Sequence, residues 1–125
     1  MLDHLGLIVR STEESKRFYG AALAPLGYGL VAERPGRAGF GPPGRPLFWV
    51  GMSASADRPL PGPVHIAFTA RSRSAVTAFH AAALEAGARD NGPPGLRPEY
   101  HANYFGAFVT DLDGNNIEAV CHDPA

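Results

Sequence analysis

The stretch DHLGLIVRSTEESKRFYGAAL (residues 3–23) is echoed by VHIAFTARSRSAVTAFHAAAL (residues 64–84) in the second half of the chain. When His4 is placed over His65, seven of twenty aligned positions are identical without a gap, the histidines included. Three of these identities are Ala or Leu, which alanine-rich helices share by chance, but the common spacing of His, Arg-Ser and Phe is not explained that way. The repeat therefore indicates two copies of one supersecondary unit.

Both copies predict a strand followed by a helix. Apolar runs at Leu5–Val9 and Val64–Ala70 predict the two strands. Ser11 and Ser72 stand where a helix N-cap is expected, and Glu14 completes a capping box in the first copy. After each helix come shorter β-like segments. They lie at Tyr28–Glu33, Ala38–Phe40, Leu47–Met52, Ala88–Asn91, Tyr104–Thr110 and Asn115–Cys121.

This order of elements predicts an α+β fold made of two βαβββ modules related by a pseudo-twofold axis. Asp111–Asn115 is a strong turn signal, so the last two strands are expected to form a hairpin, and Pro42–Gly44 has the same place in the first half. Neither module alone covers both faces of its sheet, so we expect one domain rather than two. The predicted division is one domain over 1–125, with module one at 1–52, a linker at 53–63 and module two at 64–125.

Composition argues against several classes of partner. The formal charge is −1 and no block of like charge stands out, so neither nucleic acid nor an anionic membrane is an expected partner. The apolar runs are strand-sized, and the N-terminus lacks the pattern of a signal peptide. The single cysteine, Cys121, excludes an internal disulfide and is compatible with a reducing compartment. We therefore expect a cytoplasmic protein that acts on small molecules.

The repeat also predicts a metal site. His4 and His65 occupy one register, so a pseudo-twofold axis allows them to approach each other. Glu118 lies in the last predicted strand, on a face with Asn116 and Val120. A carboxylate among apolar neighbours needs a partner, and a divalent metal ion supplies one. Taken singly, a histidine in a strand is more often structural than a metal ligand, and Glu118 alone is compatible with a solvent-exposed carboxylate on an edge strand. The prediction therefore depends on the joint pattern.

The chain resembles the vicinal oxygen chelate superfamily, which includes glyoxalase I, extradiol dioxygenases and bleomycin resistance proteins. The resemblance implies that a curved sheet encloses a central cavity, that His4, His65 and Glu118 hold a divalent ion such as Fe²⁺, Zn²⁺, Mn²⁺ or Ni²⁺, and that the protein forms a homodimer. It also implies that the metal binds substrate oxygens or O₂. The marks of the resemblance are residues 3–7 (DHLGL), 65–68 (HIAF) and 107–118 (AFVTDLDGNNIE).

Within the superfamily that this chain resembles, glyoxalase I has a fourth metal-binding residue, a glutamate in its first module. This chain departs from glyoxalase I at that position. Aligning Gly44 with Gly114 puts Phe48 where the second module has Glu118. This makes a lactoylglutathione lyase less expected than a dioxygenase or another lyase or isomerase.

The residues expected to handle protons lie in the Tyr100–Tyr104 segment. Tyr104 shares a predicted strand face with Gly106 and Phe108, so it can point into the cavity. His101 is either a base close to the metal or an ordinary loop residue. Tyr104 and His101 are therefore the predicted catalytic residues.

Three functions remain open at this point. The first is a metal-dependent dioxygenase, lyase or isomerase, and the second is a non-catalytic protein that binds a ligand or drug. The third is a scaffold that has kept the fold without turnover. Phe40, Phe48 and Trp49 form either an apolar wall for an aromatic substrate or part of the core.

Overall fold

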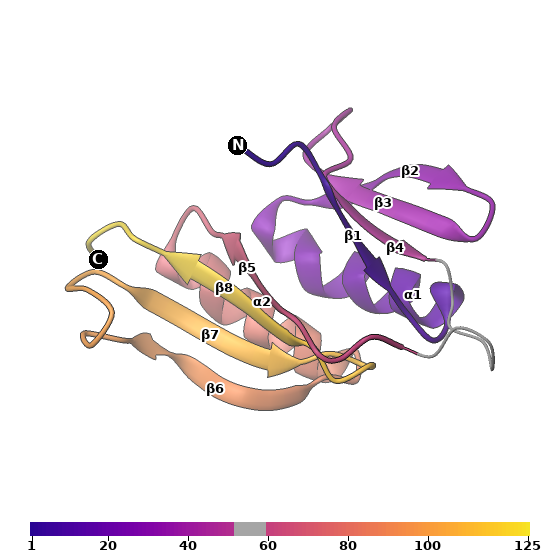
Figure 1. Cartoon of the computed structure of the whole chain (residues 1–125). Coiled ribbons are helices and arrows are strands. Elements are labelled where there is room, and N and C mark those ends of the chain that lie inside the picture. Colours follow the sequence, from indigo (N-terminus) through magenta and orange to yellow (C-terminus); the bar gives the residue numbers. More distant parts are fainter. Residues whose placement is uncertain (52–59) are drawn as a thin grey trace.

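The structure is a computed structural model that describes residues 1–51 and 60–125. It contains two βαβββ modules, as predicted (Figure 1). The first module consists of β1 (Leu5–Ile8), α1 (Thr12–Leu23), the short 3₁₀ helix η1 (Ala24–Leu26), β2 (Gly29–Arg34), β3 (Arg37–Gly41) and β4 (Phe48–Gly51). The second consists of β5 (His65–Thr69), α2 (Arg73–Glu85), β6 (Arg89–Leu96), β7 (Phe105–Thr110) and β8 (Asn116–Cys121).

The two sheets have the same topology. Their strand orders are β1-β4-β3-β2 and β5-β8-β7-β6, and the first pair in each order is parallel while the other pairs are antiparallel. The helix and the β-meander of each module supply the long connection that a parallel pair requires. The internal repeat in the sequence is therefore a repeat of the fold.

Both helices begin at the predicted caps. The Ser11 hydroxyl accepts a hydrogen bond from the Glu14 backbone N–H at 3.2 Å, and the Ser72 hydroxyl accepts one from the Ala75 N–H at 3.1 Å. Each bond satisfies a donor that the first helical turn leaves unpaired. After η1 the chain turns at Gly27, whose φ of 84° lies in the left-handed region that glycine adopts without a Cβ clash.

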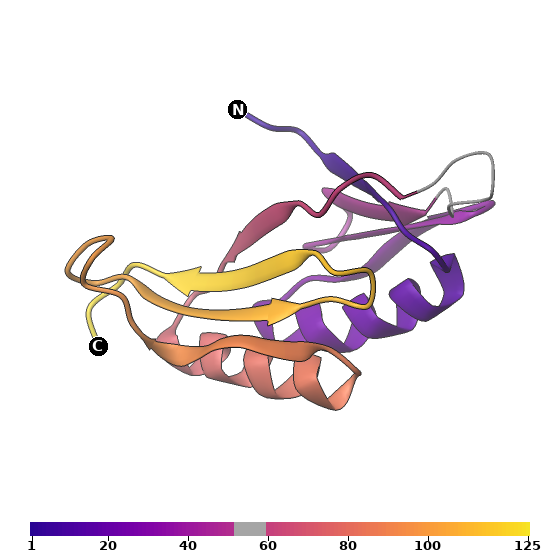
Figure 2. The ribbon, with the colours of Figure 1, turned by 60° about the horizontal axis from the view of Figure 1, so that its bottom comes forward.

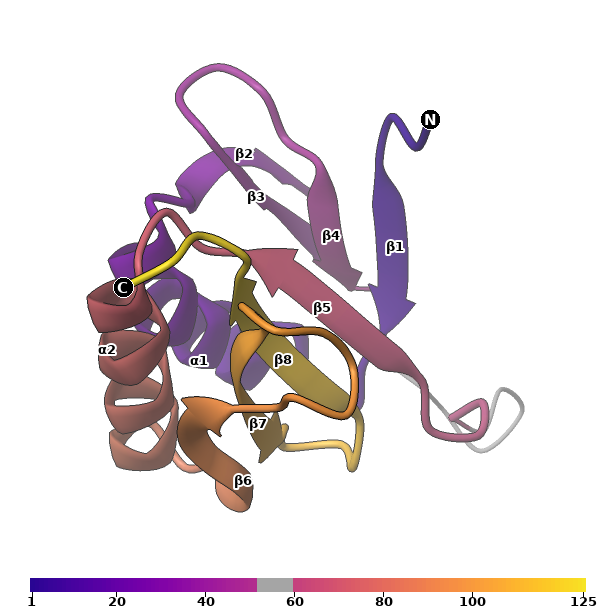
Figure 3. The same cartoon turned by 90° about the vertical axis from the view of Figure 1, so that its left-hand side faces the viewer.

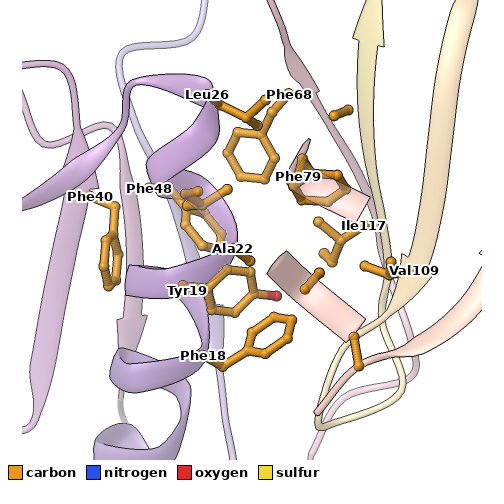
Figure 4. Close-up of a cluster of buried hydrophobic side chains, with 14 of the residues drawn as sticks. Phe18, Tyr19, Ala22, Leu26, Phe40, Phe48, Phe68, Phe79, Val109 and Ile117 are labelled. Carbon is orange, nitrogen blue, oxygen red and sulfur yellow. The ribbon is translucent and has the colours of Figure 1, made fainter. Parts of the chain in front are cut away.

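The two helices lie side by side on the same side of the sheets (Figures 2 and 3). Between helices and sheets lies a hydrophobic cluster that draws side chains from both modules (Figure 4). Phe48 of β4 and Phe68 of β5 meet edge to face, with ring centroids 5.2 Å apart. Burial of aromatic surface from both halves gives the chain one continuous core.

A buried polar contact also ties the modules together. The Tyr19 hydroxyl on α1 donates to Asp111 Oδ2, at the turn between β7 and β8, over 2.5 Å. The other oxygen of Asp111 accepts hydrogen bonds from the backbone N–H groups of Asp113 and Asn115. The predicted hairpin turn is thus built around one carboxylate that also binds the other module.

The structure departs from prediction at β6, which is longer than the predicted Ala88–Asn91 segment. It continues through Pro93 and Pro94, with register shifts against β7 on either side of Gly92. β6 is the outermost strand of its sheet, where a proline without an N–H removes no ladder bond that the sheet needs. Most of the predicted linker, residues 53–63, lies outside the described residues. Among the described helices, none has the length and apolar character needed to cross a membrane.

Candidate functional site

The second module brings two of the predicted metal ligands together. In the parallel pair of β5 and β8, His65 lies opposite Asn116, and Glu118 lies two residues further along. The His65 Nε2 atom is 3.1 Å from Glu118 Oε1. Glu118 is only 1% exposed, so its carboxylate has to be neutralised within the protein.

Both ring nitrogens of His65 face hydrogen-bond acceptors. Nδ1 is 3.1 Å from the Asn116 carbonyl oxygen, while Nε2 faces Glu118. A neutral imidazole has a single N–H, so it satisfies one of these two contacts. When Nδ1–H donates to the carbonyl, the Nε2 lone pair points towards the carboxylate, and either a second proton or a cation is needed between them.

Tyr104 completes this cluster from the chain just before β7. Its hydroxyl donates to Glu118 Oε2. Gly106 gives the two side chains room, because a Cβ there would lie 3.2 Å from both Glu118 Oε2 and Tyr104 Cε1. Burial, and then the hydrogen bond to Glu118, raise the pKa of Tyr104 well above its ordinary value. Tyr104 therefore keeps its proton at neutral pH and donates it in the hydrogen bond to Glu118.

His101 is separated from the carboxylate by Tyr104. Its ring lies 5.4 Å from the Tyr104 ring, and its Nε2 is 2.5 Å from His122 Nδ1. The two imidazoles stack, with ring centroids 4.6 Å apart. The two predicted catalytic residues thus have different contacts. Tyr104 contacts Glu118, whereas His101 contacts Tyr104 and the exposed His122, a pairing that the sequence did not predict.

His4 lies elsewhere, on the first module. Its Nδ1 is 2.7 Å from Asp3 Oδ1, and its side chain is 59% exposed. This hydrogen bond lowers the pKa of Asp3. Among residues 1–51 and 60–125, no three His, Cys, Asp or Glu side chains come close enough together to hold a metal ion. The structure therefore pairs His65 with Glu118 and leaves His4 outside that pair.

The strand register corrects one alignment. Gly6 lies opposite Trp49 in the pair β1–β4, and Ala67 lies opposite Glu118 in β5–β8. Since Gly6 and Ala67 each follow their module's histidine by two residues, Trp49 is the counterpart of Glu118. Phe48, which the sequence placed there, is fully buried in the core. The correction leaves no carboxylate at this place in the first module.

Trp49 faces a pocket on the side of the first sheet that points away from α1. The alternation along β4 puts Phe48 and Val50 in the core and leaves Trp49 on the opposite face. The pocket has a volume of about 520 Å³, within the range of small-molecule sites. Its lining includes Asp3, His4, Arg34, Arg37 and Trp49. The sequence did not single out the two arginines, although their places near the ends of adjacent strands would have allowed it.

Comparison with known proteins agrees with the fold. The crystal structure of a glyoxalase/bleomycin resistance protein from Albidiferax ferrireducens T118 is 31% identical, with a TM-score of 0.81, and the match covers 98% of this chain and 99% of that one. A glyoxalase/bleomycin resistance protein/dioxygenase family enzyme from Burkholderia phytofirmans PsJN shares the fold at 17% identity and a TM-score of 0.73, over 97% and 98% of the two chains.

A lactoylglutathione lyase from Agrobacterium tumefaciens also shares the fold, at 17% identity and a TM-score of 0.65, over 97% of this chain and 92% of that one. No match was found among curated proteins. A sequence model of the Glyoxalase/Bleomycin resistance protein/Dioxygenase superfamily matches residues 1–119. With the paired modules and the strand order described above, this match shows that the chain belongs to that superfamily.

Proposed function

We propose that the protein is a metal-dependent enzyme acting on a small molecule, of the dioxygenase, lyase or isomerase type. The observation that carries the proposal is the buried Glu118 carboxylate with the His65 imidazole directed at it. A carboxylate and an imidazole nitrogen are ligands that Zn²⁺ and Fe²⁺ accept. His65 and Glu118 would hold the ion, together with His4 as the third ligand.

The residues present fit such an ion. The backbone carbonyl of Asn116 holds the Nδ1 side of His65, which leaves Nε2 free to act as a ligand. When bound, the ion would act as a Lewis acid towards substrate oxygens or as a binding site for O₂. Tyr104 holds a proton at its hydroxyl and donates a hydrogen bond to Glu118, so it would orient that carboxylate towards the ion.

We further propose that His4 reaches the ion from a second copy of the chain, in a homodimer. Within the described residues, His4 joins no group of three potential ligands. Its sheet carries a pocket on the face that α1 leaves open, and the second sheet carries the His65–Glu118 pair on its corresponding face. A twofold dimer can place the first module of one copy against the second module of the other, which completes both sites equally.

Elemental analysis of protein purified without chelators tests the metal. We expect close to one divalent ion per chain in the wild type, and strongly reduced content in the variants His65→Gln and Glu118→Gln. His122→Gln is the matched control, because it also removes one histidine of this module but not a proposed ligand. Equal metal content in the wild type and both ligand variants would refute the proposal.

Subunit mixing tests whether the site is shared between chains. His4→Ala and His65→Ala protein are each expected to lose the metal. In a mixed dimer, the intact His4 of one chain meets the intact His65 of the other, so random re-association restores about one quarter of the wild-type metal content. A mixture that binds no more metal than its components would place all the ligands in one chain.

The use of O₂ as a co-substrate then distinguishes a dioxygenase from a lyase or isomerase. Anaerobic reconstitution with Fe²⁺, followed by measurement of O₂ uptake with catechols, identifies a dioxygenase. Metal-dependent turnover without O₂ uptake identifies a lyase or isomerase. Lactoylglutathione lyase activity is the less favoured of these, because Trp49 stands where the first module would need a second glutamate.

A non-catalytic ligand-binding protein is the second candidate. The pocket beside Trp49 favours it, since that pocket is formed within one module and needs no metal to take its shape. Ligand uptake by protein that binds no divalent ion, with no turnover in any metal-reconstituted form, would favour this function over the enzyme.

A further inference from the structure

Two arginines are brought together at one end of the first sheet. Arg34 and Arg37 lie directly opposite each other where β2 and β3 meet. Like charges at such a cross-strand pair repel each other and destabilise the sheet. Both guanidinium groups are also near the Trp49 ring, with their central carbons 6.0 Å and 5.4 Å from its centroid. The arrangement concentrates positive charge around one aromatic side chain.

Among the residues that the structure describes, no carboxylate neutralises this charge. Within residues 1–51 and 60–125, no Asp or Glu forms an ion pair with Arg34 or Arg37. Arg34 donates one hydrogen bond to the Glu33 carbonyl oxygen at 2.9 Å. The Glu33 carboxylate itself binds Lys16 at 3.0 Å, and Asp3, which lines the same pocket, binds His4. Within the described part of the chain, the other guanidinium donors of the two arginines have no carboxylate partner, and a guanidinium is suited to binding an anion.

Two glycines leave room for Trp49 and Arg37 against the backbone. Gly39 and Gly51 lie on its face of the sheet, and a Cβ at Gly39 would come within 3.0 Å of both the Trp49 ring and Pro46. A Cβ at Gly51 would overlap Arg37. The indole therefore packs down on the backbone next to the two arginines. The result is one aromatic side chain on the pocket wall with both guanidinium groups close to its ring.

We propose that this pocket binds a small organic acid with a planar apolar body. Its anionic group lies between the guanidiniums of Arg34 and Arg37, where it removes their mutual repulsion, and its planar part stacks near Trp49. His4 lines the same pocket, so in the enzyme this acid is the substrate. That last step rests on the proposed function, whereas binding of the acid to the pocket does not.

Trp49 gives a direct readout, because it is the only tryptophan in the chain. Chelator-treated protein is titrated at constant ionic strength with benzoate, with its uncharged counterpart benzamide, and with acetate, which lacks the aromatic ring. We expect a saturable change in tryptophan fluorescence with benzoate, at an affinity roughly tenfold or more above that for either control. Equal affinity for benzoate and benzamide, or no saturable change, would overturn the proposal.

Substitutions then assign the binding to the two arginines. Arg34→Gln and Arg37→Gln are each expected to weaken benzoate binding roughly tenfold, and the double variant more. Arg89→Gln, at an exposed arginine that begins β6, is the matched control and is expected to bind like the wild type. Unchanged affinity in the double variant contradicts the proposal. So does a double variant that changes the oligomeric state and not the affinity, because the arginines would then bind a carboxylate of another chain.

The outcome is independent of the metal experiments. If benzoate binds as expected but binding of a divalent ion does not depend on His65 and Glu118, the proposal of an acid-binding pocket is supported and the proposal of a metal-dependent enzyme is refuted. If metal binding depends on these residues but benzoate does not bind to the pocket, the proposed enzyme is supported and its substrate belongs to another chemical class.

Discussion

Glu118 is a carboxylate buried inside the fold. Its carboxylate is almost fully buried, and within the described residues its side-chain partners are His65 and Tyr104. An ionised carboxylate moved out of water is tolerated only when partners replace its hydration. Gly106 lies next to this carboxylate, and a Cβ there would press on both Glu118 Oε2 and the Tyr104 ring.

The contribution of Tyr104 can be measured in metal-free protein. Tyr104→Phe removes the hydroxyl that donates to Glu118, and a hydrogen bond to a charged group contributes about 1.5–3 kcal/mol. We expect the free energy of unfolding, from urea denaturation after chelator treatment, to fall by about that amount. Tyr100→Phe, at a tyrosine that is 60% exposed, is the control and is expected to change it little. Identical midpoints for the two variants would show that the contact adds no stability.

Contacts between secondary-structure elements determine how the modules sit against each other. The hydrogen bond from Tyr19 to Asp111 joins α1 of one module to the β7–β8 turn of the other. Asp111 also organises that turn, through bonds to backbone and side-chain nitrogens of Asn115. The carboxylate thus has a local role in the hairpin and a long-range role between modules.

Tyr19→Phe is expected to lower the free energy of unfolding by about 1.5–3 kcal/mol near neutral pH, because it leaves a buried carboxylate without one of its donors. The difference should depend on pH. Burial, and then the charge of Asp111, raise the pKa of Tyr19 above its ordinary value. An unfolded tyrosine loses its proton at about pH 10, so the stability that Tyr19 contributes is complete below that pH and declines above it.

The measurement is urea denaturation of both proteins from neutral pH to above pH 10. Wild-type stability is expected to fall more steeply than that of Tyr19→Phe, so the two curves approach each other by up to about 1.4 kcal/mol per pH unit. A constant difference across this range would mean that Tyr19 titrates alike in the folded and unfolded states.

For the whole molecule, the shared core decides whether the two modules unfold together. Phe68 in β5 packs against Phe48 of the first module and against Tyr28, which follows η1. Apolar burial is the main favourable term in folding, so a core made by both halves couples their stabilities. We therefore propose that residues 1–125 behave as one domain.

Phe68→Ala tests this coupling. Removing a buried phenylalanine is expected to lower the free energy of unfolding by about 3–5 kcal/mol. Because Phe68 lies between the modules, denaturation should stay a single transition when followed both by Trp49 fluorescence, which reports on the first module, and by circular dichroism. Leu96→Ala, at a 48% exposed position, is the control for loss of a large side chain. Two separate transitions in the wild type would contradict the single-domain proposal.

The amino-acid sequence by itself determined the local structure. The repeat predicted two modules, the serines predicted where the helices begin, and Asp111–Asn115 predicted the final hairpin; all three predictions are confirmed. These features depend on hydrophobic periodicity and capping, which act over a few residues. They could therefore be found without knowing how distant parts of the chain meet.

Only the tertiary structure decided which residues share a site. In the strand registers, Trp49 lies opposite Gly6 and follows Gly44 by five residues, whereas Glu118 lies opposite Ala67 and follows Gly114 by four. An alignment on the two glycines is therefore shifted by one residue. A shift of one residue turns a strand's side chains to the opposite face, which is why Trp49, rather than Phe48, is the counterpart of Glu118. The repeat placed His4 and His65 in one register, but within the described residues His4 joins no group of three potential ligands. Whether two such residues meet depends on how the modules pack, which the repeat does not specify.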